Sequence, residues 1–75
     1  MTKPFDLINE MIGKEVVILI KGNKEIRAKL IAYDIHLNLS LAKAVIKNEN
    51  GNEISTEKMF VRGDSIIYLY LFHQN

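Results

Sequence analysis

The sequence predicts a mainly β domain, in which a short N-terminal helix precedes a strongly bent, five-stranded antiparallel small barrel. The apolar residues follow a helical period up to Gly13 and a strand period after it. Short turns rich in glycine and asparagine then separate five segments of strand character. None of these connections is long enough for a parallel crossover, so adjacent strands must run antiparallel. Residues 1–75 are therefore expected to form a single domain.

The predicted helix covers residues 3–12. Its apolar residues recur at helical spacing, at Phe5, Ile8, Met11 and Ile12. Thr2 is expected to cap the start of the helix, Pro4 fits its first turn, and Gly13 suits its end. A helix this short is expected to cover one end of the barrel.

The predicted barrel occupies residues 15–72. Its expected strands are residues 15–21, 25–34, 37–47, 53–62 and 65–72. In the second strand, alternation places four apolar residues on one face, namely Ile26, Ala28, Leu30 and Ala32. In the third strand, alternation places Leu37, Leu39, Leu41 and Val45 opposite Asn38, Ser40, Ala42, Ala44 and Ile46. The pair Asn50-Gly51 indicates a hairpin between the third and fourth strands.

Composition excludes several classes of function. The chain has no cysteine, and His36 and His73 are too few and too isolated for a zinc site, so we expect no metal and no other cofactor. A net charge of +1 argues against binding to duplex DNA or to anionic membranes through a large electrostatic surface. The N-terminus lacks the apolar core of a signal peptide, and no apolar run approaches the ~20 residues of a transmembrane helix, which predicts a cytoplasmic protein.

The last two strands predict self-association. Residues 66–72 are apolar on both faces, and the end of the preceding strand is similarly apolar. An exposed edge of this kind is an aggregation site unless it is paired. Head-to-tail pairing between identical subunits closes into a ring when the rotation permits. We therefore expect a homo-oligomeric ring whose interface includes Met59, Phe60, Val61, Ile66, Tyr68 and Tyr70.

Polar and charged residues interrupt the apolar pattern at residues 33–39 and again at 61–65. An imidazole at His36 and a guanidinium at Arg62 are planes on which an unpaired base can stack. The carboxamide of Asn38 presents an acceptor beside a donor, which matches the N3–H and O4 of uracil. Because a flipped amide would match cytosine, we hypothesise that Asp34 or Asp64 fixes its orientation. This chemistry holds a nucleotide and does not transform it.

These residues resemble the Sm/Lsm family, most closely its archaeal Sm-like members. The first motif of the family is similar to residues 16–41, which contain Asp34-Ile35-His36-Leu37-Asn38-Leu39, and the second is similar to residues 59–69, which contain Val61-Arg62-Gly63-Asp64-Ser65. The resemblance spans nearly the whole chain. Ala28 and Ala32 depart from it, because the family often has glycines where the second strand bends.

The resemblance implies an SH3-like barrel whose fourth and fifth strands pair between subunits into a ring, commonly a heptamer. It implies binding of uridine-rich single-stranded RNA around the central pore, one nucleotide per subunit. In that arrangement His36 and Arg62 sandwich the base and Asn38 bonds its edge. Asp34 and Asp64 organise the site, and Gly63 tightens the turn. A second RNA contact on the helix face would use Tyr33, with Asn9 and Lys3 as weaker partners.

Two other classes of function compete with the RNA-binding ring as interpretations of these residues. A structural module whose small barrel binds protein partners would use the same polar residues only to support turns. An enzyme would need more than the acid–base set of Asp34, His36 and Asp64, because no nucleophile, metal cluster or phosphate-cradling loop accompanies these residues. We therefore expect a non-enzymatic ring that acts as an RNA chaperone or assembly platform, or with RNA-processing proteins in RNA processing or turnover.

Overall fold

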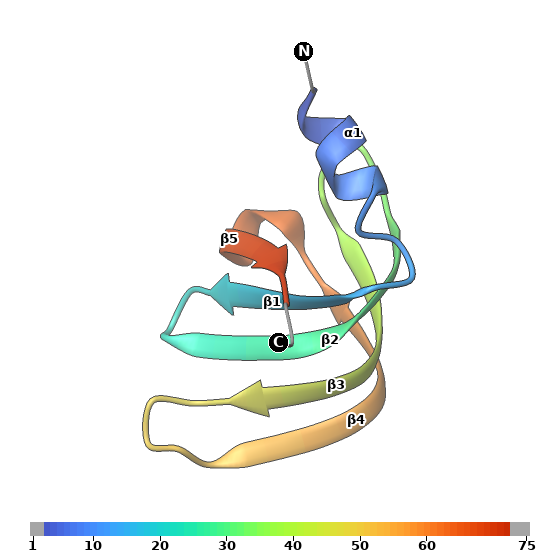
Figure 1. The fold of residues 1–75 in the computed structure, drawn as a ribbon. Coiled ribbons are helices and arrows are strands. Elements are labelled where there is room, and N and C mark those ends of the chain that lie inside the picture. The colour runs from blue at the N-terminus through green and yellow to red at the C-terminus, as the bar shows by residue number, and fades with distance from the viewer. Residues whose placement is uncertain (1–2, 73–75) are drawn as a thin grey trace.

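The computed structural model describes residues 3–72, and its elements follow the predicted order (Figure 1). They are α1 (Pro4–Asn9), β1 (Glu15–Ile20), β2 (Lys24–Tyr33), β3 (Leu39–Lys47), β4 (Glu53–Val61), the single 3-10 turn η1 (Gly63–Ser65) and β5 (Ile66–Leu71). Four of the strands are one or two residues shorter than the sequence predicted, because turn residues at their ends leave the ladder, whereas β2 keeps its predicted length and begins one residue earlier.

The five strands form one antiparallel sheet in the order β4-β3-β2-β1-β5. The prediction of a mainly β fold with a bent antiparallel sheet is confirmed. Figure 1 shows the sheet bending strongly, so that the end of β4 turns up toward η1 and β5, while α1 lies above the sheet. Within residues 3–72, β4 and β5 each pair on one side only, which leaves two free sheet edges.

A bulge in β3 reverses the predicted faces of its last residues. Arg27 pairs with Val45 and Lys29 pairs with Ala42, so β3 has one extra residue at this point. The extra residue is accommodated at Lys43, whose φ is +52°. As a result Ala44 is buried in the core, while Val45 lies beside Arg27 on the other face. Ile46 also packs against the core, so the predicted faces of Ala44, Val45 and Ile46 were wrong, because simple alternation does not register a bulge.

A second irregularity lies between Leu30 and Ala32 of β2. Leu30 pairs with Leu41 and Ala32 pairs with Ser40, so the extra residue here is Ile31, on β2. Ala32 is exposed, which corrects its predicted place on the core face. The alanines at 28 and 32 still permit a bent strand, because bulges beside them supply the curvature.

The core lies on the concave side of the sheet. Its largest fully buried side chains are Ile18, Ile26, Leu30, Leu39 and Val16. The helix region closes one end of this core with Ile8 and Met11, while Phe5 and Ile12 stay 46% and 37% exposed.

The helix itself is shorter than the predicted residues 3–12. After Asn9, the amides of Met11 and Ile12 donate to carbonyls three residues back, at 2.9 and 3.3 Å, so the chain tightens into a turn before Gly13. Lys3 is the N-cap residue, and the predicted cap Thr2 lies outside the described residues. Among residues 3–72, no helix is long and apolar enough to cross a membrane.

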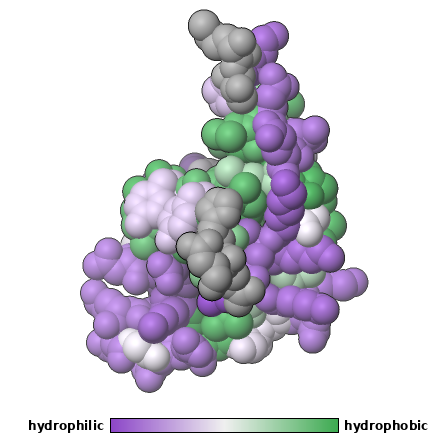
Figure 2. All heavy atoms as spheres, viewed as in Figure 1, coloured by the Kyte–Doolittle hydropathy of each residue, from purple (hydrophilic) through white to green (hydrophobic). Residues whose placement is uncertain are grey.

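Apolar side chains are also exposed on the two edge strands. On β4, Ile54 is 66% and Phe60 is 61% exposed, and on β5 Ile67 is 56%, Tyr68 52% and Tyr70 48% exposed. Figure 2 shows apolar and weakly polar surface around β5 and beside the helix, whereas strongly hydrophilic residues gather at the end that carries the two hairpin turns. On this face, the uncovered apolar surface is therefore concentrated around β5 and the helix.

Candidate functional site

Two connections meet at one end of the sheet, the turn between β2 and β3 and the 3-10 turn between β4 and β5. The first is closed by its own backbone: the Leu37 amide donates to the Asp34 carbonyl at 3.0 Å, and the Asp34 amide donates to the Asn38 carbonyl at 3.2 Å. Leu37 takes a left-handed φ of +60°, which is uncommon for a residue with a Cβ. The turn therefore holds residues 34–38 in a defined conformation.

The carboxylate of Asp34 organises this turn. Its Oδ1 accepts the amide of His36 at 2.8 Å and the amide of Asn38 at 3.0 Å, and its Oδ2 accepts the side-chain Nδ2 of Asn38 at 2.9 Å. The bond from the Asn38 side chain is the main reason that the pKa of Asp34 is lowered from its ordinary value of 3.8. The two backbone amides and the nearby His36 lower this pKa further, while partial desolvation opposes them.

Gly63 anchors the second turn against the first. Its amide donates to Oδ1 of Asn38 at 2.9 Å, although 25 residues separate the two in sequence. A Cβ at Gly63 would lie 1.9 Å from the carbonyl oxygen of His36, so no side chain fits between the two backbones. The glycine is needed for this close approach, which is a more specific reason than the tight turn expected from the sequence.

Arg62 and Asp64 flank this glycine. Arg62 Nη2 lies 3.1 Å from Asp64 Oδ2, but the two side chains are 75% and 66% exposed, so the ion pair contributes little stability. Ser65, which sequence reasoning did not single out, donates from Oγ to the Arg62 carbonyl at 2.7 Å and so holds the turn. Of the two aspartates considered for fixing Asn38, the structure places Asp34 on its amide and Asp64 on Arg62.

The two turns together line a hollow of about 530 Å³. Its lining consists of His36, Asn38, Arg62, Gly63 and Asp64, all of which were predicted as site residues. The Nδ2 and the Oδ1 of the Asn38 side chain each already make one hydrogen bond. One N–H of Nδ2 and one lone pair of Oδ1 therefore remain for a ligand. The hollow thus combines two planar groups, the imidazole of His36 and the guanidinium of Arg62, with the oriented donor and acceptor of Asn38.

Tyr33 is not part of this hollow. Its ring stacks on Phe5 with centroids 6.1 Å apart, and its hydroxyl donates to the Phe5 carbonyl at 3.1 Å. The groove beside it has a largely apolar lining that includes Asn9, Ile12 and Ile35. Among the described residues, no group of three or more histidine, aspartate or glutamate side chains is arranged to hold a metal ion.

The residues predicted for a subunit interface lie on the two edge strands, but they differ in exposure. Phe60, Tyr68 and Tyr70 are exposed, whereas Met59 and Ile66 pack partly against the core of their own chain. Val61 is only 4% exposed, because its side chain belongs to that core. Its side chain is therefore not available to a neighbour, and only its backbone lies at the edge.

Comparison with known proteins gives consistent matches over nearly the full chain. The LSM domain model of protein families matches residues 6–71. An snRNP Sm-like protein of Thermococcus gammatolerans is 42% identical over 65 residues, which are 87% of this chain and 86% of that protein. The counterpart from Thermococcus sibiricus is 40% identical over 65 residues, with the same two coverages.

Solved structures agree with this match. The structure of a Pyrococcus abyssi Sm protein in complex with a uridine heptamer is 33% identical, with a TM-score of 0.86 over 95% of this chain and 100% of that one. A heptamer from P. aerophilum is 27% identical, with a TM-score of 0.90 over 99% of both chains.

Proposed function

The chain belongs to the Sm/Lsm family, and we propose that it binds uridine-rich single-stranded RNA, one uridine in each hollow formed by residues 34–38 and 62–64. Members of this family are RNA-binding ring proteins and are not enzymes. The uridine heptamer bound by the Pyrococcus abyssi relative supports the same class of ligand here.

The observation that carries the proposal is the fixed orientation of the Asn38 amide. The carboxylate of Asp34 accepts from its Nδ2 and the amide of Gly63 donates to its Oδ1, so a flip would set donor against donor and acceptor against acceptor. The free lone pair of Oδ1 then accepts the N3–H of uracil, and the free N–H of Nδ2 donates to O4. Cytosine presents the reversed pattern and leaves both groups unpaired, which disfavours it.

His36 and Arg62 hold the base by stacking, which contributes about 1–3 kcal/mol per base and does not depend on its identity. The charge of Arg62 is partly neutralised by Asp64, and Asp34 adds a second carboxylate nearby. Phosphate neutralisation is therefore a minor part of binding at each hollow. Tight binding requires several hollows to engage one strand, because avidity multiplies modest single-site affinities.

Asp34→Asn tests the orientation argument. An asparagine keeps an oxygen for the amides of His36 and Asn38, but it places an NH₂ where Oδ2 accepted from Nδ2 of Asn38. We expect the ratio of affinities for uridine and cytidine decamers, measured by fluorescence anisotropy, to fall at least tenfold. Asp64→Asn is the matched control and should leave the ratio unchanged, because Asp64 pairs with Arg62 and not with the amide of Asn38. An unchanged ratio in Asp34→Asn refutes the role of Asp34.

We further propose a homo-oligomeric ring, most simply a heptamer, in which β4 of one subunit pairs with β5 of the next. The exposed apolar residues on the two free edges support this pairing, as does the heptameric assembly of the P. aerophilum relative. Native mass spectrometry with and without a uridine decamer measures subunit number and RNA stoichiometry together. A folded monomer that binds no decamer would contradict both proposals.

The cellular role proposed for this ring is that of a cytoplasmic RNA chaperone or assembly platform, or of a component of RNA processing or turnover that works with processing enzymes. The non-enzymatic site supports a role in holding RNA rather than cutting it. Ultraviolet crosslinking in cells should recover RNA with uridine-rich single-stranded segments, and Asn38→Ala should lose that enrichment. Recovery of RNA without a uridine bias would argue against this role.

A further inference from the structure

The outer face of the sheet carries a valley that runs along β3. Its floor is formed by two small residues, Ser40 and Ala42, and larger side chains rise on both sides. Ala42 pairs with Lys29 of β2 and with Lys58 of β4, so these three residues form one row across the sheet. In the next row, Ser40 pairs with Phe60 of β4 and lies beside the bulged Ile31 of β2.

The valley is large enough for a ligand and open to solvent. Its volume of about 650 Å³ lies within the range of small binding sites. The walls stand two strand spacings apart, roughly 10 Å, which is the width needed by one extended chain. Ile31 and Phe60 are 46% and 61% exposed, so the apolar end is uncovered within one subunit. Phe60 is also a residue predicted for the subunit interface, whereas Ile31, Ser40 and Ala42 lie on interior strands, so pairing along the edge of β4 leaves the face above β3 open.

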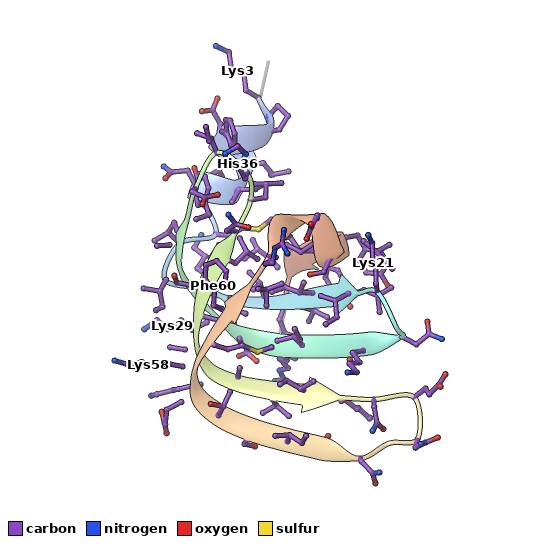
Figure 3. The ribbon with its side chains drawn as sticks, turned by 180° about the vertical axis from the view of Figure 1, so that it is seen from behind. Lys3, Lys21, Lys29, His36, Lys58 and Phe60 are labelled. Carbon is purple, nitrogen blue, oxygen red and sulfur yellow. The ribbon has the colours of Figure 1, made fainter. Side chains whose placement is uncertain are left out.

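The two rows differ in chemistry. Lys58 lines one end of the valley and Lys29 lies beside that end in the same row, so this end is positive, whereas Ile31 and Phe60 make the other end apolar. Figure 3 shows Lys29 and Lys58 projecting from the same side of the sheet, with Phe60 nearer the end that carries His36 and α1. Neither lysine has an ion-pair partner within residues 3–72. Glu15, which pairs with Lys29 in the ladder, directs its carboxylate to Arg27 instead.

We propose that this valley binds an extended segment of a partner protein that carries a bulky apolar side chain and, two residues away, an aspartate or glutamate. In an extended chain, side chains two residues apart point to the same side and lie roughly 7 Å apart, which matches the spacing of the two rows. The apolar side chain fills the space over Ser40 between Ile31 and Phe60. The carboxylate then lies over Ala42 between the two lysines.

The separation of charge from apolar surface favours a peptide over RNA. An RNA strand carries a phosphate at every nucleotide. If one phosphate lay between the lysines, the next would lie over Ile31 and Phe60, and that end of the valley has no cation in its lining. A peptide can match one apolar row and one positive row without burying a second charge. The valley is also lined by different residues from the uridine hollow, so the two sites can be tested separately.

The test uses the intact protein and a fluorescent, acetylated and amidated pentapeptide, Gly-Phe-Ser-Asp-Gly, followed by anisotropy. We expect saturable binding of this peptide by the wild type. Ala42→Leu, whose larger side chain fills the floor of the valley, should lower the affinity at least tenfold. The double variant Lys29→Glu with Lys58→Glu should lower it by a similar factor. The double variant should instead bind Gly-Phe-Ser-Lys-Gly. Lys21→Glu, a lysine in the β1–β2 turn outside the valley, is the matched control and should bind like the wild type.

A second peptide, Gly-Ser-Phe-Asp-Gly, places the same two side chains on adjacent residues, which face opposite sides of an extended chain. Equal binding of this peptide overturns the proposal, as does no binding of the first peptide at 1 mM or wild-type affinity in the double variant. If a uridine decamer displaces the peptide, and Ala42→Leu weakens the decamer, the valley is an RNA path and the proposal is also wrong. Decamer binding that Ala42→Leu leaves unchanged, while peptide binding is lost, supports two separate sites.

Discussion

Replacing Gly63 by alanine tests the contact that joins the two halves of the uridine hollow. The added Cβ would lie 1.9 Å from the carbonyl oxygen of His36 and 2.9 Å from the carbonyl carbon of Leu37. Both neighbours are backbone atoms, so the clash is relieved only by moving the 34–38 turn away from η1. The φ of Gly63 is not in the left-handed region, so the cost arises from lack of space and not from an unfavourable dihedral angle.

The size of the effect follows from two terms. Overpacking typically costs about 1–3 kcal/mol, and a clash with backbone belongs at the upper end of that range. Moving the turns apart also breaks the bond between the Gly63 amide and Asn38 Oδ1, which adds about 1 kcal/mol. We therefore expect the free energy of unfolding to fall by about 3–4 kcal/mol. For a domain of this size that is a decrease in Tm of at least ~12 °C.

Differential scanning calorimetry at fixed subunit concentration measures the Tm, and anisotropy with a uridine decamer measures binding, which should weaken at least tenfold. Gly51→Ala is the matched control: its φ is +85° and nothing lies within 4 Å of the added Cβ. It should cost about 1–2 kcal/mol through strain alone and leave decamer binding unchanged. A Gly63→Ala protein that melts within ~4 °C of the wild type and binds the decamer normally would refute the close approach.

Three further predictions concern single side chains. Because the pKa of Asp34 is lowered in the folded protein, its contribution to stability is complete above its ordinary value of 3.8 and is lost as the pH falls through the lower folded-state pKa. A carboxyl NMR titration should show a midpoint below 3.8 that rises in Asn38→Ala, and no rise would contradict the assigned cause. Arg27→Ala removes the ion pair with Glu15 and the guanidinium that lies 3.6 Å from the Phe72 ring centre. Because the side chains of Arg27 and Glu15 are both 44% exposed, the free energy of unfolding in urea should fall by only about 0.5–1 kcal/mol. Leu39→Ala empties a fully buried core position and should cost about 2–5 kcal/mol in the same assay, so a loss below 1 kcal/mol would show that the core can collapse around it.

The order of the elements and most of the core could be predicted from the sequence because both depend on local patterns. Gly13, the turn at residues 21–24 and Asn50-Gly51 mark boundaries that lie within a few residues of those in the structure. The two bulges were not predictable in this way. A bulge depends on how two strands pair, so the reversal of Ala44 and Val45 leaves no trace in the alternation of β3 alone.

The candidate site was predicted to different depths for different residues. The bond between Asp34 and Asn38 was one of two alternatives, and it is local, spanning four residues. That His36 and Arg62 lie in the same site was predicted from the resemblance to the Sm/Lsm family, and not from local sequence patterns. The anchoring amide of Gly63 was missed, because a backbone donor carries no side-chain signal and its acceptor lies 25 residues earlier. Only the folded chain shows that the amide of Asn38 is held from both sides.

The bond between Gly63 and Asn38 has a consequence for the order of events during synthesis. The turn that carries Asn38 leaves the ribosome first, but its acceptor oxygen stays unanchored until β4 has paired with β3 and Gly63 has followed. A nascent or truncated chain therefore lacks the selectivity proposed for the finished protein. Base selectivity is therefore expected only after residue 63 has been added and β4 has paired with β3.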